Sequence, residues 1–295
     1  MGKHAYLILA HKNFNQLRKL IELLDHPRND IYVHVDGKAS DFNPADFDGA
    51  PRYSRLRFLP ERLKVNWGGV SIMRAELALL KEATTTDSYD YYHLLSGLDM
   101  PIKSQDEIHR FFDSHQGKEF LNLWEFKKST FSRFRYYSVF PEGELRFATR
   151  IVNHIVKGLQ MAVGFRINRN VDFHFGSQWF SITDPLARYV VSHEDWLEKV
   201  FRHTTTCDEI FLPTLVMNSP FKDNLFVTQK VKNQQEINLG NMRLIDWTRG
   251  ESIRHPWVFR ADDMPMLEKA EHLWARKFDE NVDAVIIDKL YSKLK

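Results

Sequence analysis

Two short, continuously apolar segments near the N-terminus constrain the fold more than any other feature of this sequence. The first covers residues 5–10 and the second covers residues 31–36. Between them, from Asn15 to Leu24, apolar residues recur at helical spacing. Short apolar strands joined by a helix are typical of a parallel sheet that is buried on both faces. This region therefore predicts a strand–helix–strand unit of an α/β fold.

The remaining pattern extends this unit along the chain. Strands are expected over 56–59, 91–95 and 178–183, and helices over 70–82, 105–114, 185–202, 209–217 and 282–290. Ser104 is the predicted N-cap of the helix over 105–114. The stretch between the last two helices is expected to be irregular. No internal repeat or low-complexity linker interrupts the chain, so we predict one continuous domain over 1–295.

Charge and cysteine content exclude several classes of protein. A net charge of +2 over 295 residues gives no argument for a nucleic-acid partner. The single cysteine, Cys207, excludes an internal disulfide and indicates a reducing compartment. The apolar run at 5–10 is too short for the core of a secretory signal, and no stretch approaches the roughly eighteen apolar residues of a spanning helix. We therefore expect a cytoplasmic protein.

Two acidic residues directly follow predicted strands. Asp36 ends the second apolar segment, and Asp99 lies in Ser96-Gly97-Leu98-Asp99-Met100-Pro101. In open α/β sheets, ligands bind beyond the carboxyl ends of the strands, where a carboxylate can accept hydrogen bonds from a ribose or a base. The alternative for Asp36 is a plain Asp-Gly turn, and the alternative for Asp99 is a cap on the turn into Pro101.

The sequence argues against a metal at this edge. A D-x-D pair would chelate a divalent cation, but Gly97 stands where the partner of Asp99 would be. The one D-x-D, Asp46-Phe47-Asp48, lies in a polar loop that we expect to be exposed. Trp67-Gly68-Gly69 opens the helix over 70–82, where the glycines either let the backbone approach an anionic or polar ligand or relieve a tight turn.

Glu209 and a group of basic residues complete the candidates. Glu209 stands at the start of the helix over 209–217, either as a general base or as an acidic residue that complements the helix dipole. The basic residues of the last quarter are Arg254, Arg260, Arg276 and Lys277. We interpret Arg276 as a solvated surface charge. In a reaction that releases a diphosphate without the help of a metal, cationic side chains must stabilise the negative charge that develops on the phosphates.

Seven segments, in order, carry a resemblance to a known family. They are Leu9-Ala10-His11-Lys12, Val33-His34-Val35-Asp36, Trp67-Gly68-Gly69-Val70-Ser71, Leu94-Leu95-Ser96-Gly97-Leu98-Asp99-Met100-Pro101-Ile102, Gly176-Ser177-Gln178-Trp179-Phe180, Asp208-Glu209, and Arg254-His255-Pro256 through Asp263. Together they resemble glycosyltransferase family 14, which contains the core-2/I-branching N-acetylglucosaminyltransferases and the peptide O-xylosyltransferases. The resemblance runs over nearly the whole chain.

The resemblance implies a GT-A-like α/β fold, with a Rossmann-like nucleotide-sugar-binding half over about 1–125 and an acceptor and catalytic half over about 126–295. It also implies an inverting mechanism that needs no divalent metal or other cofactor. Glu209 matches the catalytic carboxylate of the family. The expected nucleotide and diphosphate contacts are His11, Asp36, Arg254 and Lys277. The expected donor-side contacts are Trp67, Gly68 and Asp99, and the expected acceptor contacts are Trp179 and Trp247.

We accordingly expect transfer from a UDP-sugar, of the UDP-GlcNAc or UDP-xylose type, to a glycan or lipid-linked glycan hydroxyl with a β linkage. The animal members of the family are Golgi membrane proteins with several disulfides, whereas this sequence has one cysteine and no expected spanning helix. It therefore resembles a bacterial-type member that acts in surface polysaccharide synthesis. One alternative is a glycoside hydrolase that pairs Glu209 with Asp208 or Asp99. Another is a non-catalytic protein that binds carbohydrates or anions. The alternative for Trp247 is that its ring packs in the core and contacts no acceptor.

Residues 126–170 combine many basic and aromatic residues with an apolar stretch over 151–165. Basic residues that flank an apolar helix are what a peripheral membrane contact requires. The alternative is a helix packed in the core beside an arginine-rich acceptor groove.

Overall fold

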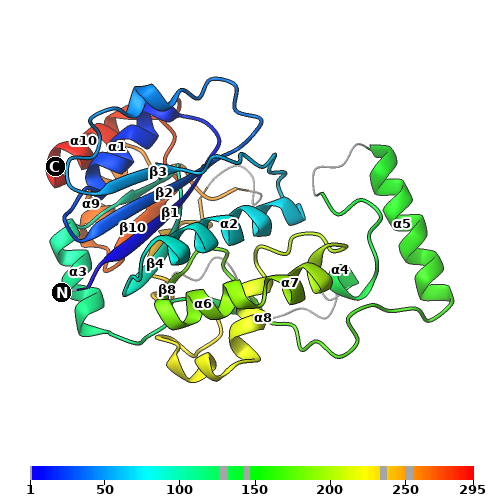
Figure 1. Ribbon diagram of the computed structural model, residues 1–295. Helices are drawn as coiled ribbons and strands as arrows, with labels where there is room; N and C mark the ends of the chain where they lie inside the picture. The colour runs from blue at the N-terminus through cyan, green and yellow to red at the C-terminus, as the bar shows by residue number, and fades with distance from the viewer. Residues whose placement is uncertain (1, 126–131, 143–146, 233–237, 250–254) are drawn as a thin grey trace.

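A parallel sheet forms the centre of the protein. The computed structural model describes residues 2–125, 132–142, 147–232, 238–249 and 255–295. The strands of the main sheet are β1 (His4–Ala10), β2 (Asn29–Val35), β3 (Arg55–Phe58), β4 (Tyr91–Ser96) and β8 (Ser181–Thr183). They lie in the order β3-β2-β1-β4-β8, and only β8 runs antiparallel to its neighbour (Figure 1). The predicted α/β class is confirmed.

Helices cover both faces of this sheet because the central strands bury side chains on both sides. Ala5 and Leu7 of β1 belong to one core, and the intervening Tyr6 and Ile8 belong to the other. The helices of the first core are α2 (Val70–Thr86), α6 (Asp184–Ser192), α7 (Glu194–Phe201) and α8 (Phe211–Met217). Those of the second are α1 (Phe14–Leu24), α3 (Gln105–Ser114), α9 (Met264–Lys269) and α10 (Ala284–Leu294).

A second, smaller sheet brings the end of the chain back beside its beginning. Its strands are β5 (Asp99–Pro101), β10 (Trp274–Arg276) and β9 (Arg243–Ile245), in that order. Strand β10 runs antiparallel to β5 and parallel to β9, and α10 packs on α1 (Figure 1). A further pair joins β6 (Leu123–Trp124) to β7 (Phe175–Gly176). The regions 1–125 and 126–295 therefore interleave in space, since β8 and β10 complete sheets that begin in the first region.

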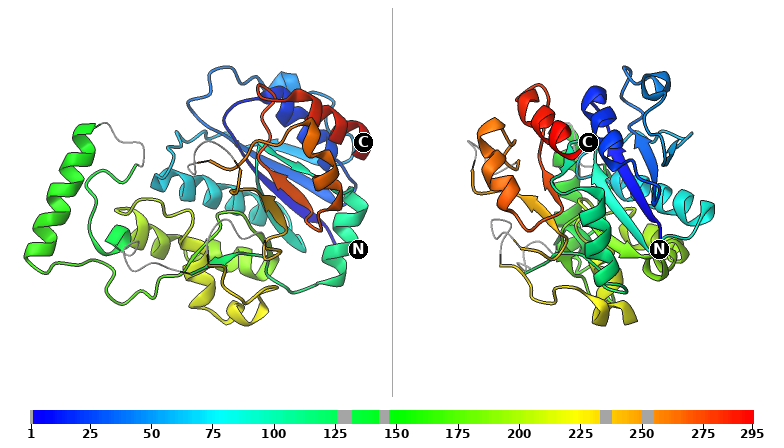
Figure 2. Two further views of the ribbon diagram at one scale, coloured as in Figure 1. Left: turned by 180° about the vertical axis from the view of Figure 1, so that it is seen from behind. Right: turned by 90° about the vertical axis from the view of Figure 1, so that its left-hand side faces the viewer.

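Helix α5 (Phe147–Ala162) projects from this body. It stands apart from the sheet in Figure 1 and in the left view of Figure 2, whereas the short helix α4 (Ser132–Arg135) packs on the first core through Phe134. The side-chain amides of two α5 residues bond the backbone of the irregular segment that precedes the helix. Gln160 bonds both the N–H and the carbonyl of Tyr137, and Asn153 does the same with Phe140. We call residues 136–142 and 147–165 the α5 arm.

Most predicted elements are confirmed, and the differences have local causes. Ser104 forms a capping box with Glu107 at the start of α3, as predicted. The helix expected over 185–202 is two helices that meet at His193. The region expected to be irregular holds β9, α9 and β10, whose three-residue strands carry too little pattern to be seen in sequence.

Two further expectations can be compared with the structure. Asp46 and Asp48 are exposed beside the short 3₁₀ helix Pro44–Phe47, so the predicted exposure of the D-x-D loop is confirmed. The alternative that α5 packs in the core is wrong, because Ile151, Ile155 and Leu159 are exposed. Among the described helices, none combines the length and the apolar character that crossing a bilayer would require.

Candidate active site

The carboxyl ends of β1, β2 and β10 bring together residues that are far apart in the sequence. His11 follows β1, Asp36 follows β2 and Lys277 follows β10. Partial burial lowers the pKa of His11; the charges of Lys12, Arg276 and Lys277 lower it further, and Asp36 opposes them. These groups therefore face one another at one edge of the sheet, as predicted for ligand-binding residues of an open α/β fold.

Asp36 forms the turn that was considered from sequence. Its Oδ1 accepts hydrogen bonds from the N–H groups of Lys38 and Val65, at 2.8 and 3.3 Å, so the turn is confirmed. Its Oδ2 lies 3.7 Å from the Lys38 ammonium. The turn thus fixes a carboxylate at the end of β2, where one oxygen is not used by the backbone.

Arg276, at the end of β10, is not the surface charge that we predicted. Its guanidinium donates to Asp99 Oδ1 at 2.7 Å and lies 4.4 Å from the centre of the Trp179 ring. The second oxygen of Asp99 accepts the N–H of Ser96 at 2.9 Å. Because Asp99 is buried, its charge requires such partners. Asp99 therefore positions Arg276, and both carboxylate oxygens are engaged.

Trp179 and Trp247 differ in how much surface they offer to an acceptor. Trp179 is only 7% exposed and stacks with Arg276, so its ring supports that guanidinium and offers little surface for a sugar. Its predicted role as an acceptor contact is not supported by this burial. Trp247 lies two residues beyond β9 and is half-buried, so part of its side chain is accessible.

Lys277 is the diphosphate-binding candidate that the structure describes. Burial lowers its pKa, and the nearby charges of Arg276 and Lys12 lower it further. Lys12 is itself held by Asp279, with Nζ 2.6 Å from Oδ2. Three positive side chains, Lys12, Arg276 and Lys277, therefore lie close together. The other predicted diphosphate contact, Arg254, lies outside the described residues.

The Trp67-Gly68-Gly69 segment meets the loop that carries Glu209. Gly68 has a φ of 68°, a conformation that glycine adopts without strain, and its carbonyl accepts the N–H of Thr206 at 2.7 Å. The space beside Gly69 is occupied by the protein's own Glu142. A Cβ at Gly69 would lie 2.4 Å from its Oε2, which also accepts a bond from Ser71. Trp67 is 68% exposed beside this contact.

Glu209 belongs to a cluster of poorly solvated carboxylates. It precedes α8, which begins at Phe211 with no acidic residue in its first turn, so the helix-capping alternative is wrong. Burial raises the pKa of Glu209, the charge of Asp208 raises it further, and Arg133 opposes both. Burial also raises the pKa of Asp208, whose Oδ1 has no hydrogen-bond partner in the described part of the chain. Raised carboxylate pKa values of this kind are typical of catalytic bases.

The segment Gly176–Phe180 connects the positive residues at the strand ends with the carboxylates around Glu209. The Gly176 N–H donates to the Glu209 carbonyl at 2.9 Å, and Gln178 donates to buried Glu76 at 2.8 Å. Asp208 is close enough for its charge to raise the pKa of Glu76. Because Trp179 supports Arg276 from the same segment, this motif lies between the cationic strand ends and the carboxylate cluster.

Sequence reasoning missed four residues of the site. Lys12 and Glu76 lie in or near recognised motifs but were not singled out. Arg133 was counted only as part of a basic region, and Arg276 was assigned to the surface. The signal for Lys12 was its place in the Leu9-Ala10-His11-Lys12 segment, whereas the partner of Arg276 is 177 residues away and has no local signature.

Within the described ranges, no three His, Cys, Asp or Glu side chains are placed so that they could hold a metal ion.

Comparisons with known proteins identify the family. The profile described as "Branch: Core-2/I-Branching enzyme" matches residues 4–271. Xylosyltransferase 2 of Rattus norvegicus is 26% identical over 303 residues, which cover 96% of this chain and 33% of that protein. Xylosyltransferase sqv-6 of Caenorhabditis briggsae is 25% identical over 312 residues, which cover 96% and 35%. The chain thus spans about a third of the length of these relatives.

Among solved structures, mouse xyloside xylosyltransferase 1 in its apo form aligns with 92% of this chain and 97% of its own, at 10% identity and a TM-score of 0.38. The family profile covers all five strands of the main sheet and the Glu209 loop, and it ends before Arg276 and Lys277. The chain therefore belongs to the Core-2/I-branching enzyme family of glycosyltransferases.

Proposed function

We propose that this protein transfers a sugar from a UDP-sugar to a glycan hydroxyl, with inversion at the transferred carbon. The observation that carries the proposal is the meeting of His11, Arg276 and Lys277 at the carboxyl ends of the strands. Positive charge at that edge suits a nucleoside diphosphate. The relatives are named xylosyltransferases, which supports a donor of the UDP-xylose type, with UDP-GlcNAc as the second candidate.

Glu209 is the proposed base. Its carboxylate takes the proton of the acceptor hydroxyl while that oxygen forms a bond to the anomeric carbon from the face opposite the leaving group. The bond from the anomeric carbon to the diphosphate oxygen breaks, and its electron pair leaves with UDP. Lys277 and Arg254 are the proposed cations that stabilise this charge. An α-linked donor then gives a β-linked product.

The same geometry supports a reaction without a divalent metal. Asp99 is the carboxylate nearest to the position that a D-x-D pair would occupy, and its two oxygens are engaged by Ser96 and Arg276. Arg276, Lys277 and Lys12 supply positive charge at the same edge. We propose that these side chains act in place of a cation. No other cofactor is proposed.

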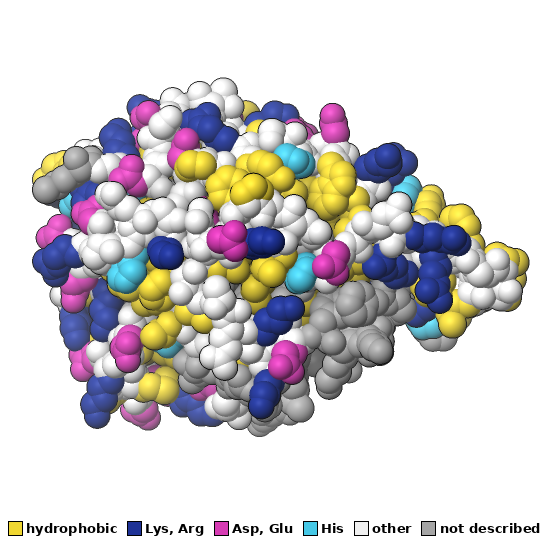
Figure 3. All heavy atoms as spheres, turned by 90° about the horizontal axis from the view of Figure 1, so that it is seen from below, with side chains coloured by type: hydrophobic (Ala, Val, Ile, Leu, Met, Phe, Trp, Pro, Cys, Tyr) yellow, Lys and Arg dark blue, Asp and Glu magenta, His cyan; other side chains and the backbone are white. Residues whose placement is uncertain are grey.

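We further propose that the α5 arm rests on an anionic membrane surface, where a lipid-linked acceptor for surface polysaccharide would be held. Ile151, Ile155 and Leu159 recur every four residues on one face of α5, and the last two are 56% and 64% exposed. Figure 3 shows hydrophobic and basic side chains interleaved at this protruding end. This composition suits the interface of a bilayer at the inner face of a cell membrane.

Glu209→Gln should abolish turnover and leave UDP affinity intact, because only the ionisable group is lost. A screen of UDP-sugars by thermal shift selects the donor, and release of UDP from that donor measures turnover. We expect a loss of about a hundredfold or more. Glu119→Gln is the matched control, since Glu119 is also buried with a raised pKa but bonds Thr183. Normal turnover of Glu209→Gln would show that another carboxylate is the base, and sugar release from glycosides without nucleotide would indicate a hydrolase.

The pH dependence of kcat/KM should report the ionisation of the carboxylate pair Asp208 and Glu209. Because the base must be ionised, activity should fall on the acidic side with an apparent pKa above the ordinary glutamate value of about 4.3. Asp208→Asn removes the neighbouring negative charge and should move this limb to lower pH by about one pH unit. Asp172→Asn, at an exposed carboxylate, should leave the limb in place. If the acidic limb of the profile does not move in Asp208→Asn, the charge of Asp208 does not influence the pKa of the base.

The same pKa shift gives a stability readout. A carboxyl whose pKa is raised by folding contributes stability fully below its unfolded pKa, and this contribution is lost as the pH rises through the folded pKa. Glu209→Gln should therefore raise the Tm relative to the unmodified protein at pH 8 but not at pH 4. Equal Tm differences at both pH values would contradict the burial of an ionisable Glu209.

Activity should survive an excess of EDTA, because Asp99 is engaged and protein cations face the diphosphate site. UDP release and UDP affinity are measured with EDTA and with added manganese. Loss of turnover in chelator that manganese restores would contradict the proposed mechanism and make Asp99 a candidate ligand.

The protein should sediment with anionic liposomes at low salt and be released at high salt. Ile155→Asn with Leu159→Asn should abolish this binding with little change in Tm, because both side chains are exposed. Val282→Asn with Val285→Asn is the matched control, since these residues are similarly exposed outside the arm. The proposed membrane contact is overturned if the protein stays in the supernatant at low salt. It is also overturned if the control variant loses liposome binding to the same extent.

A further inference from the structure

An acidic residue just beyond β10 is bonded to two residues that directly follow β1. Asp279 Oδ2 accepts a hydrogen bond from the Lys12 ammonium at 2.6 Å, and Asp279 Oδ1 accepts one from the side-chain amide of Asn13 at 2.8 Å. Asp279 is buried. One buried carboxylate therefore joins the carboxyl ends of two strands, although Lys12 and Asp279 are 267 positions apart in the sequence.

The backbone on both sides of this contact is also fixed. Asn13 has a φ of 57°, in the left-handed region that asparagine adopts more readily than most residues. Its side-chain oxygen accepts a hydrogen bond from the side-chain amide of Asn281 at 2.9 Å, and the Asn281 N–H donates to Asp279 Oδ1 at 3.1 Å. Asn13, Asp279 and Asn281 thus form a closed ring of hydrogen bonds between the two turns.

Gln16 of α1 adds a second connection about one helical turn further along. Its side-chain amide donates to the carbonyls of Gly97 and Phe278, each at 3.3 Å. Its side-chain oxygen accepts the N–H of Glu280 at 3.1 Å. The residues on both sides of Asp279 are therefore bonded to α1, so the start of α1 sets the position of the Asp279 backbone.

Lys12 and Arg276 are held by carboxylates in the same way. In each ion pair the carboxylate is less accessible than the cation. The exposed fractions of the side chains are 10% for Asp279 and 40% for Lys12, and 1% for Asp99 and 20% for Arg276. The carboxylate is thus the fixed partner, and the cation stays accessible to a ligand. A lysine ammonium has three donors, so the contact with Asp279 does not use all of them.

The charge of Lys12 reaches the groups of the proposed nucleotide site. Burial lowers the pKa of His11 and of Lys277, and in both cases Lys12 lowers it further. Burial by itself would raise the pKa of Asp279, but the hydrogen bonds from Lys12 and Asn13 outweigh it and lower that pKa to about 2. Asp279 is therefore ionised at neutral pH, beside the cations that we propose for the diphosphate.

We propose that Lys12 binds a phosphate group of the nucleotide donor and that Asp279 is the positioning residue that holds its ammonium there. This role rests on the proposed transferase function, since a nucleoside diphosphate is the ligand. Lys12 becomes a third phosphate-binding cation beside Lys277 and Arg254. A carboxylate by itself repels a diphosphate, so Asp279 favours donor binding only through the residues that it positions.

Calorimetric titration of the intact protein with UDP and with uridine tests this role. If Asp279 acted only by its charge, Asp279→Asn would tighten UDP binding, because a negative charge is removed. Positioning predicts the opposite sign. The asparagine keeps an oxygen for Asn13 but loses the ionic partner of Lys12, so UDP should bind about tenfold more weakly, the effect of one charged hydrogen bond. Uridine has no phosphate and should bind both proteins equally.

A double-mutant cycle with Lys12→Gln determines whether Asp279 acts through Lys12. Lys12→Gln can still donate to Asp279 and should fold even if Asp279→Asn does not. It should weaken UDP binding about tenfold or more and leave uridine affinity unchanged. In the Lys12→Gln background, Asp279→Asn should no longer weaken UDP binding, because no ammonium is left to position. A loss shared by UMP and UDP identifies the α-phosphate as the ligand of Lys12, and a loss with UDP alone identifies the β-phosphate.

Asp288→Asn is the matched control. Asp288 of α10 pairs with Lys19 of α1, so this variant removes the same charge from another ion pair between the beginning and the end of the chain. It should leave UDP affinity unchanged.

The role of Asp279 is overturned if Asp279→Asn binds UDP as tightly as the unmodified protein or more tightly. It is also overturned if the loss persists in the Lys12→Gln background, or if uridine binding falls as much as UDP binding. An unmodified protein that binds no UDP would contradict the proposed transferase as well. UDP binding that depends on neither Lys12 nor Asp279 would contradict the positioning role alone.

Discussion

A guanidinium in a protein interior requires hydrogen-bond acceptors, and Arg243 sets this requirement at the centre of the fold. The residue is 3% exposed at the start of β9. It donates to the carbonyls of Leu94 on β4 and Phe180 before β8, at 3.0 and 2.6 Å, and lies over the Trp274 ring of β10. Burial of an unsatisfied charge would be very costly, so these contacts fix the small sheet against the main sheet. The positions of Asp99 on β5 and Arg276 on β10 follow from that alignment, and with them the cationic edge of the site.

The N-terminal half of the fold could be predicted because burial on both faces leaves a local signal. The apolar segments at 5–10 and 31–36 became β1 and β2, and Ser104 with Glu107 became a capping box. Strands β5, β9 and β10 have three residues each, so their pairing depends on topology and not on periodicity. The same limit applied to the site. Glu209 was identified through a motif, but the burial that raises its pKa and the pairing of Arg276 with Asp99 arise only in three dimensions. Trp179 was recognised as a site residue, yet sequence cannot tell a ring that supports an arginine from a ring that faces a sugar.

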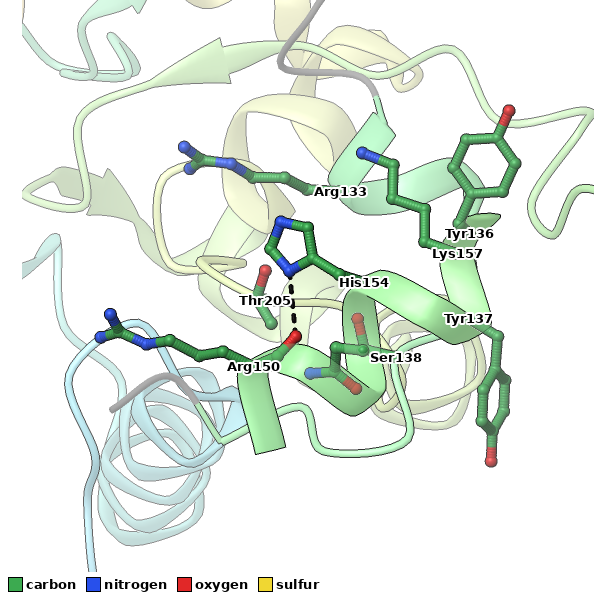
Figure 4. Close-up of a pocket in the computed structure, with 9 residues that line it drawn as sticks. Arg133, Tyr136, Tyr137, Ser138, Arg150, His154, Lys157 and Thr205 are labelled. Atoms are coloured by element: carbon green, nitrogen blue, oxygen red, sulfur yellow. Dashed lines mark hydrogen bonds between the residues drawn. The ribbon is translucent and has the colours of Figure 1, made fainter. Parts of the chain in front are cut away.

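Charge is distributed over the site in three zones. Positive groups gather at the strand ends, weakly solvated carboxylates lie around Asp208 and Glu209, and Arg133, Arg150 and Lys157 line a cavity beside α5 (Figure 4). Arg133 belongs to the last zone and acts on the middle one. A carboxylate between two cationic zones experiences opposing effects, since burial favours its protonated form and the cations favour its ionised form. The result at Glu209 is a pKa that stays raised although Arg133 opposes the rise.

The attachment of the α5 arm bears on how this protein can diverge over evolutionary time. Gln160 and Asn153 connect α5 to chain at Tyr137 and Phe140, and α5 stands apart from the sheet in Figure 1 and in the left view of Figure 2. Substitutions on α5 therefore cost the folded body little, whereas changes at Arg243 or Asp99 disturb buried charge. Lineages can therefore sample sequences on α5 while the buried charges of the two sheets stay under purifying selection. Within a family built this way, sequence divergence should concentrate in α5.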